Sequence, residues 1–529
     1  MTRMRAARLR RLATATVVPM TVLLTALPGL SRAQTAAVSV GAAGTPIVTA
    51  PEDPAIAAAV ARIAPAQVHA DIEKLVSFRN RSTISSMETD LPPGTGVLAA
   101  ADWIASEFER ISATCGHCLE VKRDDFVEPP QSGPSARIVK PTRIVNVYAV
   151  LRGSSDAERR LLVTGHYDSR NTDVLNTHDP APGANDDASG VAVSLECARA
   201  LATSGIRFPA TLVFAAVAGE EQGLNGSAHL AKLAKQEGWQ LEAVLNNDIV
   251  GGDTTPGDTL QDKSTVRVFS EGVPAGTSAA ELQRIQTVGA ENDSPSREVA
   301  RAIAEIGASY FPPQMEHAGP AAPGHARSHL VRVLPAFHPV LIFRRDRFLR
   351  GGDHTSFNEQ GFAAVRFTEW RENFNHQHQD VRLAEGTNAD GSKGQVQFGD
   401  LPEFVDSGYV ANVARLNAAA LASLALAPGE PENVRVLTAN LDNNTQLAWD
   451  PPKNFPAGAH YEVVWRATTA ATWTDAVSVG TRNAVTLPVS KDDVILAVRS
   501  VDAAGHRSPA VYPWPSRIGQ LPRPASAPR

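Results

Sequence analysis

The sequence predicts an α/β domain with a mostly parallel, mixed sheet and helices on both faces, followed by a small all-β sandwich at the C-terminus. Three apolar segments with strand character, at 161–163, 211–217 and 243–245, alternate with helix-like segments at 191–202 and 227–237. This βαβαβ order is typical of a parallel sheet covered by helices. Because ligands of such sheets bind beyond the carboxyl ends of the strands, we expect a functional site there.

The other elements of this domain are predicted from apolar periodicity and from turn residues. We expect helices at 56–63, 67–78, 96–111, 294–308 and 406–425, and strands at 120–126, 142–151, 266–269, 339–343 and 363–367. The domain is therefore predicted to span residues 56–427. A Pro-rich segment at 428–431 marks its end.

After this point the pattern changes to short alternating strands separated by turn residues, which is typical of a small β-sandwich. The sequences Leu447-Ala-Trp-Asp-Pro-Pro and Tyr461-Glu-Val-Val-Trp-Arg resemble a fibronectin type III domain, and the resemblance covers residues 428–517. We expect Trp449, Tyr461 and Trp465 in its core. The Pro-rich segment 518–529 is predicted to be a disordered tail.

Composition and charge place the chain among globular proteins. It has 529 residues, which exceeds one ordinary domain, and 43% of them are hydrophobic and 20% charged. The formal net charge of −6 gives no basic surface for nucleic acid, so we expect no nucleic-acid partner. The sequence does not indicate an oligomeric state.

The N-terminus has the features of a secretory signal peptide. Five arginines precede an apolar run at 12–30, and Ser31-Arg32-Ala33 provides small residues at the usual cleavage spacing. We expect cleavage after Ala33, so residues 1–33 are a signal peptide and 34–55 an Ala/Gly/Thr/Pro linker. The alternative is a membrane anchor, but no other apolar run approaches the ~20 residues of a membrane span. The mature protein is expected to be exported, periplasmic or secreted, without stable membrane association.

Cysteine usage agrees with export. Cys115 and Cys118 enclose a short Gly-His segment, and in an oxidising compartment we expect a local disulfide between them. A redox motif or a zinc knuckle are the alternatives, but no suitable strand or second ligand pair lies nearby in sequence. Cys197, in an apolar helical segment, is expected to be a buried free thiol.

Polar side chains follow each predicted central strand. His166 and Asp168 are two residues apart at a strand end, so their side chains leave on one face, as a metal-binding imidazole and its carboxylate partner would. Asp186, Glu221 and Asp248 occupy other strand ends. Each has a structural alternative, such as helix capping or a solvated loop, yet together they place a potential metal ligand at every strand end of one sheet.

The last ligand is expected from the segment 374–380, where His376 is the first candidate and His378 the alternate. Three carboxylates against four positive charges, with a bridging hydroxide, would give a neutral centre, so the charges favour two zinc ions with open coordination. Adjacent residues in an extended segment point in opposite directions. Glu220 can therefore handle the proton of an attacking water while Glu221 binds metal.

The ordered set of these segments resembles the co-catalytic zinc aminopeptidases of the aminopeptidase Y type, over roughly residues 56–425. The resemblance implies a zinc exopeptidase fold, two zinc ions and peptide substrates with a free N-terminus. It further implies His166 and Asp248 on one zinc, Glu221 and His376 on the other, Asp186 as bridging ligand, Glu220 as general base and Asp168 as the partner of His166. The segments are Gly165-His-Tyr-Asp, Gly183-Ala-Asn-Asp-Asp-Ala-Ser-Gly, Gly219-Glu-Glu-Gln-Gly, Asn247-Asp-Ile-Val-Gly, Gly352-Asp-His, and His376 with Asp380.

One position departs from this family. Many members have Tyr before the final His, where its hydroxyl stabilises the tetrahedral intermediate, but this chain has Asn375. That role would pass to another donor such as His354, next to Asp353, although these two residues could instead cap the helix that follows. Four arginines could contact a substrate carboxylate, with a solvated turn as the alternative: Arg344, Arg345, Arg347 and Arg350.

The leading functional hypothesis is an exported zinc-dependent aminopeptidase, which hydrolyses N-terminal amino acids from peptides by a two-zinc, activated-water mechanism. A carboxypeptidase or a glutaminyl cyclase-like enzyme on the same scaffold is the second hypothesis. A non-catalytic binding protein, led by the β-sandwich, is the third. Side-chain specificity, the role of the β-sandwich and the choice between periplasm and extracellular medium are not predicted by the sequence.

Overall fold

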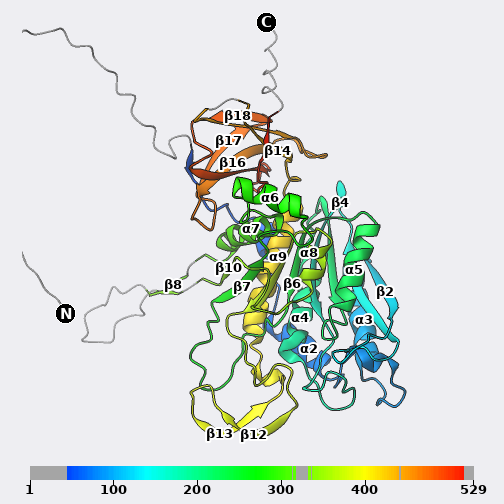
Figure 1. Ribbon diagram of the computed structural model, residues 1–529. Coiled ribbons are helices and arrows are strands. Elements are labelled where there is room, and N and C mark those ends of the chain that lie inside the picture. Colours follow the sequence, from blue (N-terminus) through cyan, green and yellow to red (C-terminus); the bar gives the residue numbers. More distant parts are fainter. Residues whose placement is uncertain (1–43, 313, 317–331, 335, 440–441, 518–529) are drawn as a thin grey trace, which may run out of the picture. The chain divides into compact units, whose positions relative to one another are not determined.

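In the computed structural model, an eight-stranded mixed sheet organises the larger part of the chain, with strand order β10-β7-β11-β6-β4-β5-β3-β2 (Figure 1). The central strands β11, β6, β4 and β5 run parallel, whereas β2, β3 and β7 run antiparallel to their inner neighbours. The predicted mixed, mostly parallel sheet is confirmed. Its strands are β2 (Leu119–Glu128), β3 (Thr142–Leu151), β4 (Asp156–His166), β5 (Ala210–Val217), β6 (Gln240–Asn247), β7 (Thr265–Ser270), β10 (His338–Ile342) and β11 (Ala364–Glu369).

The structure describes residues 44–312, 314–316, 332–334, 336–439 and 442–517. The predicted signal peptide (1–33), the first part of the predicted linker and the predicted tail (518–529) lie outside these residues. The described residues all belong to one unit of the chain, Val40–Arg529.

Burial on both faces explains why the central strands are so apolar. All residues of β5 are buried, and they alternate between two hydrophobic clusters. Leu212, Phe214 and Ala216 join the cluster on one face, whereas Val213 and its alternate neighbours join the other. A strand covered on both sides has no polar face, so its sequence is a continuous apolar run.

Helices cover both faces of the sheet, as predicted (Figure 1). Two helices, α5 and α8, pack on one face, and the others that pack on the sheet, among them α3, α4, α7 and α9, lie on the opposite face. The helices are α1 (Pro54–Val60), α2 (Pro65–Val76), α3 (Val97–Thr114), α4 (Ser189–Ala202), α5 (Asn225–Gln236), α6 (Ala279–Val288), α7 (Pro295–Tyr310), α8 (His354–Glu359) and α9 (Ser407–Leu426), with short η segments at Thr83–Met87, Ala184–Ala188 and Pro402–Phe404.

Helix α9 is long and apolar enough to span a membrane by composition alone, with a mean hydropathy of 1.3, and it is the one such helix among the described residues. However, 83% of its apolar window is buried inside the protein. It packs against α4, α7, β4 and β5, so its apolar residues are explained by the core. Two antiparallel strand pairs are separate from the main sheet: β8 (Gln314–Glu316) with β9 (Arg332–Leu334), and β12 (Arg382–Thr387) with β13 (Lys393–Phe398).

The C-terminal part is a β-sandwich of two four-stranded sheets, ordered β1-β17-β16-β19 and β18-β15-β14-β20. This confirms the predicted sandwich, and Trp449, Tyr461 and Trp465 are buried in its core as expected. Its strands are β1 (Thr45–Pro46), β14 (Glu432–Leu437), β15 (Thr445–Asp450), β16 (His460–Ala467), β17 (Asp475–Gly480), β18 (Ala484–Leu487), β19 (Val494–Val501) and β20 (Trp514–Ser516).

Three further observations concern segments singled out by the sequence. Residues 44–53, predicted as part of a linker, are structured: β1 pairs with β17, and Asp53 caps α1. Cys115 and Cys118 form the expected disulfide directly after α3. Cys197 is a buried free thiol in α4, and burial raises its pKa.

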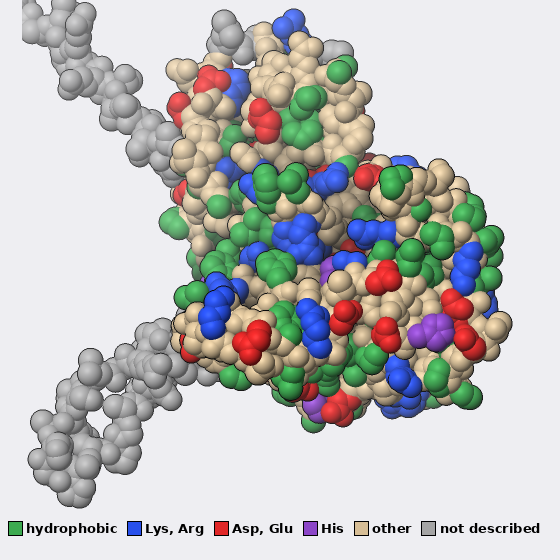
Figure 2. Space-filling view, turned by 60° about the horizontal axis from the view of Figure 1, so that its bottom comes forward, with side chains coloured by type: hydrophobic (Ala, Val, Ile, Leu, Met, Phe, Trp, Pro, Cys, Tyr) green, Lys and Arg blue, Asp and Glu red, His purple; other side chains and the backbone are tan. Residues whose placement is uncertain are grey.

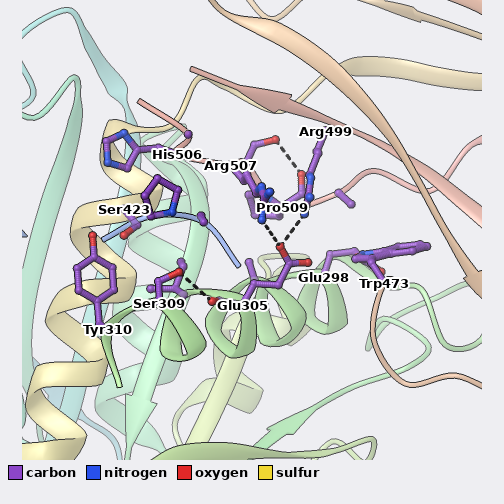
Figure 3. A pocket seen from close by; sticks show the side chains of 17 residues that line it. Glu298, Glu305, Ser309, Tyr310, Ser423, Trp473, Arg499, His506, Arg507 and Pro509 are labelled. Carbon is purple, nitrogen blue, oxygen red and sulfur yellow. Dashed lines mark hydrogen bonds and ion pairs between the residues drawn. The ribbon is translucent and has the colours of Figure 1, made fainter. Parts of the chain in front are cut away.

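The sandwich contacts α7 through buried charged groups. Arg466 pairs with Asp293 at 2.5 Å, and Trp473 donates from Nε1 to Glu298 at 3.0 Å. Figure 3 shows the neighbouring cavity of about 40 Å³, where Glu305 accepts from Arg499 and also pairs with a second arginine of the sandwich. Every buried carboxylate of this contact thus has a cationic or hydrogen-bonding partner from the chain itself.

Candidate metal centre

The first group of candidate ligands forms at the carboxyl end of β4. His166 is the last residue of this strand and is fully buried. Gly165, just before it, allows α4 to approach, since a Cβ at this position would lie 2.4 Å from the backbone of Gly190. The Nδ1 atom of His166 lies 3.1 Å from the carbonyl oxygen of Asp168, whereas Nε2 has no hydrogen-bond partner within the described part of the chain. The imidazole therefore presents an unused nitrogen to the site.

Asp168 contacts His166 and also holds the turn after β5. Its Oδ1 lies 3.5 Å from Nδ1 of His166, consistent with the expected partnership. Its carboxylate also accepts from the backbone nitrogens of Glu220 and Glu221, at 3.4 and 3.2 Å, and from the hydroxyl of Thr83, at 3.0 Å. Thr83 lies far away in sequence and carries no signal that could have predicted this contact. Asp168 thus ties the end of β4 to the turn after β5.

Asp186 lies between two imidazoles. Its Oδ1 is 3.1 Å from Nε2 of His166, and its Oδ2 is 2.9 Å from Nε2 of His378. The backbone nitrogen of Asp186 donates to Asp400 at 2.7 Å, which fixes the turn before α4. The side chain of Gln377 also donates to Asp186, at 3.0 Å. Neither Asp400 nor Gln377 was predicted as a site residue, because each acts only through tertiary contact.

The two adjacent glutamates after β5 join different groups of potential ligands. His166, Glu220 and Asp248 offer ligand atoms that all lie within 4.8 Å of one another, and Asp186, Glu221 and His378 form a second group of this kind. This division agrees with the expected opposite orientation of Glu220 and Glu221. Burial raises the pKa of Glu220 well above its ordinary value, and the charges of Asp248 and Glu221 act in the same direction.

The structure corrects the predicted histidine. His378, not His376, faces the acids, with Nε2 at 3.0 Å from Oε1 of Glu221. His376 lies aside: Nδ1 is 2.7 Å from Asp253, and the ring stacks on Phe404. Residues 374–378 form turns, and His378 has a positive φ of 57°, so two residues of separation do not place both imidazoles on one face.

The predicted partner of His376 is also elsewhere. Asp380 accepts from the backbone nitrogen of Thr172 at 3.1 Å and lies outside both ligand groups. The acid that contacts His376 is instead Asp253, from the segment after β6. Within this irregular loop, the spacing between His376 and Asp380 did not predict the acid that His376 contacts.

The remaining predicted contacts lie around the site rather than in its opening. His354 is buried, its Nε2 lies 2.8 Å from the carbonyl oxygen of Arg345, and burial lowers its pKa to about 4. Asp353 is buried, and burial raises its pKa to about 7. It makes no capping hydrogen bond at the start of α8, so the helix-cap alternative is not supported. Asn375 lines a separate cavity of about 490 Å³, together with His376.

The side chains of the two ligand groups do not satisfy one another by hydrogen bonds, and they have the chemistry of metal ligands. Nε2 of His166 and Oε1 of Glu221 are buried and lie 3.1 Å from Asp186 and 3.0 Å from His378, but neither atom makes a hydrogen bond of good geometry among the described residues. Four carboxylates converge here, but few cationic groups reach them: Arg366 contacts Asp248 at 2.7 Å, and Arg170 contacts Glu221 at 3.1 Å. Uncompensated buried carboxylates are costly, and imidazole nitrogen with carboxylate oxygen is a donor set that zinc accepts. The residues therefore fit zinc.

The centre opens into a cleft of about 710 Å³. Figure 2 is turned so that the carboxyl ends of the parallel strands come forward, and it shows Lys and Arg side chains gathered over the middle of this face beside acidic ones. The cleft combines the acids of both ligand groups with arginines and a few apolar side chains. Its lining includes Arg137, Arg170, Asp186, Glu220, Glu221, Leu224, Asp248, Arg347, Leu349, Arg350, Phe374, Gln377 and His378.

Comparison with known proteins gives the family. Residues 146–298 match the model of peptidase family M28. The chain is 45% identical over 467 residues to a probable zinc metalloprotease of Leptosphaeria maculans, covering 88% of this chain and 98% of that protein. A probable zinc metalloprotease of Pyricularia oryzae is 46% identical over 470 residues, with 88% and 85% covered. The LapA aminopeptidase of Legionella pneumophila superposes with a TM-score of 0.44 at 20% identity, over 69% of this chain and 73% of that one. The chain thus belongs to peptidase family M28 and is a zinc metallopeptidase.

Proposed function

We propose that this protein is an aminopeptidase that removes N-terminal residues from peptides by means of two zinc ions. The observation that carries the proposal is the position of Asp186, whose two carboxylate oxygens face two different imidazoles at 3.1 and 2.9 Å. A carboxylate placed in this way can bridge two cations. Each imidazole has its own further acid within the same group, Asp248 for His166 and Glu221 for His378.

The roles of the ligands follow from this geometry. His166 and Asp248 would hold one zinc, Glu221 and His378 the other, and Asp186 both. When bound, zinc supplies Lewis acidity to a carbonyl oxygen and to water. Arg366 holds Asp248 from behind at 2.7 Å, and Gln377 holds Asp186 at 3.0 Å, so both carboxylates are oriented by neutral or cationic donors.

Glu220 is the group that moves a proton. It belongs to the same cluster as His166 and lines the cleft, so it can accept a proton from the attacking water and return it to the leaving amine. Its backbone nitrogen is held by Asp168, which limits where the side chain can reach. A carboxylate of the cleft could also bind the ammonium group of a free N-terminus through a charge-assisted hydrogen bond.

A panel of aminoacyl chromogenic substrates, with free and with acetylated amino groups, tests the proposal. We expect cleavage of the free compounds only, loss of activity after zinc removal by a chelator, and recovery when zinc is returned. Release of C-terminal residues would favour a carboxypeptidase instead. Cyclisation of N-terminal glutamine by a protein with a single zinc would favour the cyclase alternative.

We also propose that the protein is exported, with cleavage after Ala33. The Cys115–Cys118 disulfide supports this, because disulfides persist in oxidising compartments. N-terminal sequencing of the protein recovered from the medium or periplasm should begin at Gln34, whereas an intact N-terminus would contradict export by this route. The sandwich, with Trp449 in its core, is proposed to be a fibronectin type III-like module.

A further inference from the structure

An arginine from the loop between β2 and β3 reaches the rim of the catalytic cleft. Nη1 of Arg137 donates to the backbone carbonyl of Glu221 at 2.7 Å, and its backbone nitrogen is held by Gln131 at 2.9 Å. Arg137 is exposed and lines the cleft. Within the described parts of the chain it forms no ion pair. Its guanidinium therefore donates to one neutral carbonyl oxygen and has further donors free.

The other arginines of the cleft are already engaged. Arg347 and Arg350 both contact Glu372, at 2.7 and 2.8 Å. Arg170 contacts Glu221, at 3.1 Å. Arg137 differs from all three, because its guanidinium donates to a neutral carbonyl oxygen and pairs with no acid among the described residues.

The acids of the lining do not neutralise Arg137 once the centre is loaded. The four acidic residues that line the cleft are Asp186, Glu220, Glu221 and Asp248, and all of them belong to the two ligand groups. Two divalent cations would match their charge. An anionic group entering the loaded cleft would then meet Arg137 as its free cationic partner.

The position of Arg137 also indicates which part of a peptide it meets. A cation repels the ammonium group of the substrate, so the N-terminal residue lies away from Arg137 and the leaving portion lies toward it. Arg137 contacts the backbone of Glu221, whose side chain belongs to one of the two ligand groups, so Arg137 lies beside the centre on the side of Glu221.

We propose that Arg137 binds a carboxylate of the peptide on the leaving side of the scissile bond, and thereby selects short or acidic peptides. The carboxylate is either the C-terminus of a di- or tripeptide or the side chain of an acidic residue after the bond. A guanidinium binds a carboxylate through two parallel hydrogen bonds, which suits the donors that Arg137 has free. The proposal rests on the proposed aminopeptidase function. Leu349 and Phe374 are exposed apolar residues of the same cleft, so they can contact uncharged side chains of the substrate.

Two matched substrate pairs test this on the zinc-loaded full-length protein: Leu-Ala against Leu-Ala-NH2, and Leu-Glu-NH2 against Leu-Gln-NH2. We expect a kcat/KM about tenfold higher for the carboxylate member of at least one pair, since a hydrogen bond to a charged group has this effect. The change should lie mainly in KM. Preference in the first pair assigns the C-terminal carboxylate, and preference in the second assigns the acidic side chain.

Arg137→Ala should abolish the preference, because kcat/KM should fall more for Leu-Ala and Leu-Glu-NH2 than for their uncharged partners Leu-Ala-NH2 and Leu-Gln-NH2. Arg137→Lys should retain part of the preference. Arg143→Ala is the matched control, because Arg143 follows on β3, pairs with Asp125 and does not line the cleft. Equal rates within both wild-type pairs, or an equal loss on all four substrates in Arg137→Ala, would overturn the proposal.

A binding measurement separates this proposal from the proposed function. Calorimetric titration of Leu-Glu-NH2 and Leu-Gln-NH2 into zinc-loaded Glu220→Gln protein needs no turnover. Tighter binding of the acidic peptide, lost in the double variant with Arg137→Ala, supports the arginine's role even if the enzyme cuts another bond. Equal affinities, with Leu-Ala binding no more tightly than Leu-Ala-NH2, would contradict it even in an active aminopeptidase.

Discussion

Two regions of this protein bury several carboxylates each, and they treat the charge in different ways. Between α7 and the sandwich, Asp293 pairs with Arg466, and Glu298 accepts from Trp473 and contacts Arg301. At the carboxyl ends of the parallel strands, by contrast, four acids converge with two imidazoles, and among the described residues arginines contact two of these acids, Asp248 and Glu221.

The difference shows which buried charges need something from outside the chain. In the first region each acid contacts at least one arginine, although one oxygen of Asp293 accepts no hydrogen bond among the described residues, and these ion pairs hold two parts of the protein together. In the second region the chain supplies fewer cations than acids. Burying the unpaired carboxylates costs free energy, and bound metal ions would offset this cost. A buried cluster in which acids outnumber the cations that contact them therefore indicates a metal centre better than the number of acids alone.

The largest expected effect is that of Glu220→Gln, which removes the proposed proton acceptor but keeps the shape and polarity of the side chain. We expect kcat to fall by about 10²–10⁴-fold, the usual contribution of a general base. Zinc content, measured by elemental analysis, should stay within the wild-type range. Turnover close to the wild-type value would assign proton transfer to another group.

Replacing each of the two neighbouring histidines by alanine tests which of them binds zinc. His378→Ala should lower zinc content by one ion per chain, because His378 is the imidazole that faces Asp186 and Glu221. His376→Ala should retain the full zinc content, because His376 contacts Asp253 instead. Equilibrium dialysis followed by elemental analysis of both variants makes the measurement. Loss of zinc from His376→Ala alone would restore the histidine first expected from the sequence.

Removing an ion pair between α7 and the sandwich should lower the stability of the protein and leave its zinc content unchanged. Arg466→Ala leaves Asp293 with one cationic neighbour fewer in a buried position. Removing one partner of a buried ion pair costs about 3–5 kcal/mol, so the free energy of unfolding in denaturant should fall by this amount. The variant should bind as much zinc per folded chain as the wild type. Unchanged stability would mean that this contact does not hold the sandwich in place.

A smaller effect concerns pH. Burial raises the pKa of Glu298 from 4.5 to about 7, against the opposing charge of Arg301, while Asp293 acts with burial. The folded protein therefore keeps a proton that the unfolded chain releases, and between about pH 4.5 and 7 this group's contribution to stability declines as pH rises. Glu298→Gln is neutral at every pH and should flatten this decline by on the order of 2 kcal/mol. Thermal unfolding at pH 5 and pH 7.5 compares the two proteins, and parallel curves would contradict the assignment.

The sequence predicted those parts of the fold in which local pattern and burial coincide. Strands β4, β5 and β6 were predictable because each is an apolar run that ends in polar residues. The pairing of β1 with β17 was not, because a two-residue strand is selected by a distant sheet edge and leaves no local pattern. The antiparallel position of β7 beside β11 likewise depends on long-range packing.

The same division applies to the site. His166, Asp186, Glu221 and Asp248 were expected together because parallel strand ends converge, and the structure brings them together. The choice between His376 and His378 could not be predicted, since it depends on turn geometry in an irregular loop. Thr83, Asp400 and Arg366 support the ligands only through tertiary contacts, so no spacing in the sequence indicates their roles.

The central claim is that Asp186 lies between two metal ions. Anomalous diffraction at the zinc edge, from crystals of the zinc-loaded protein, tests it most directly. We expect two peaks on either side of Asp186, one against His166 and Asp248 and the other against Glu221 and His378. A single peak, or a second peak at His376 and Asp253, would contradict it.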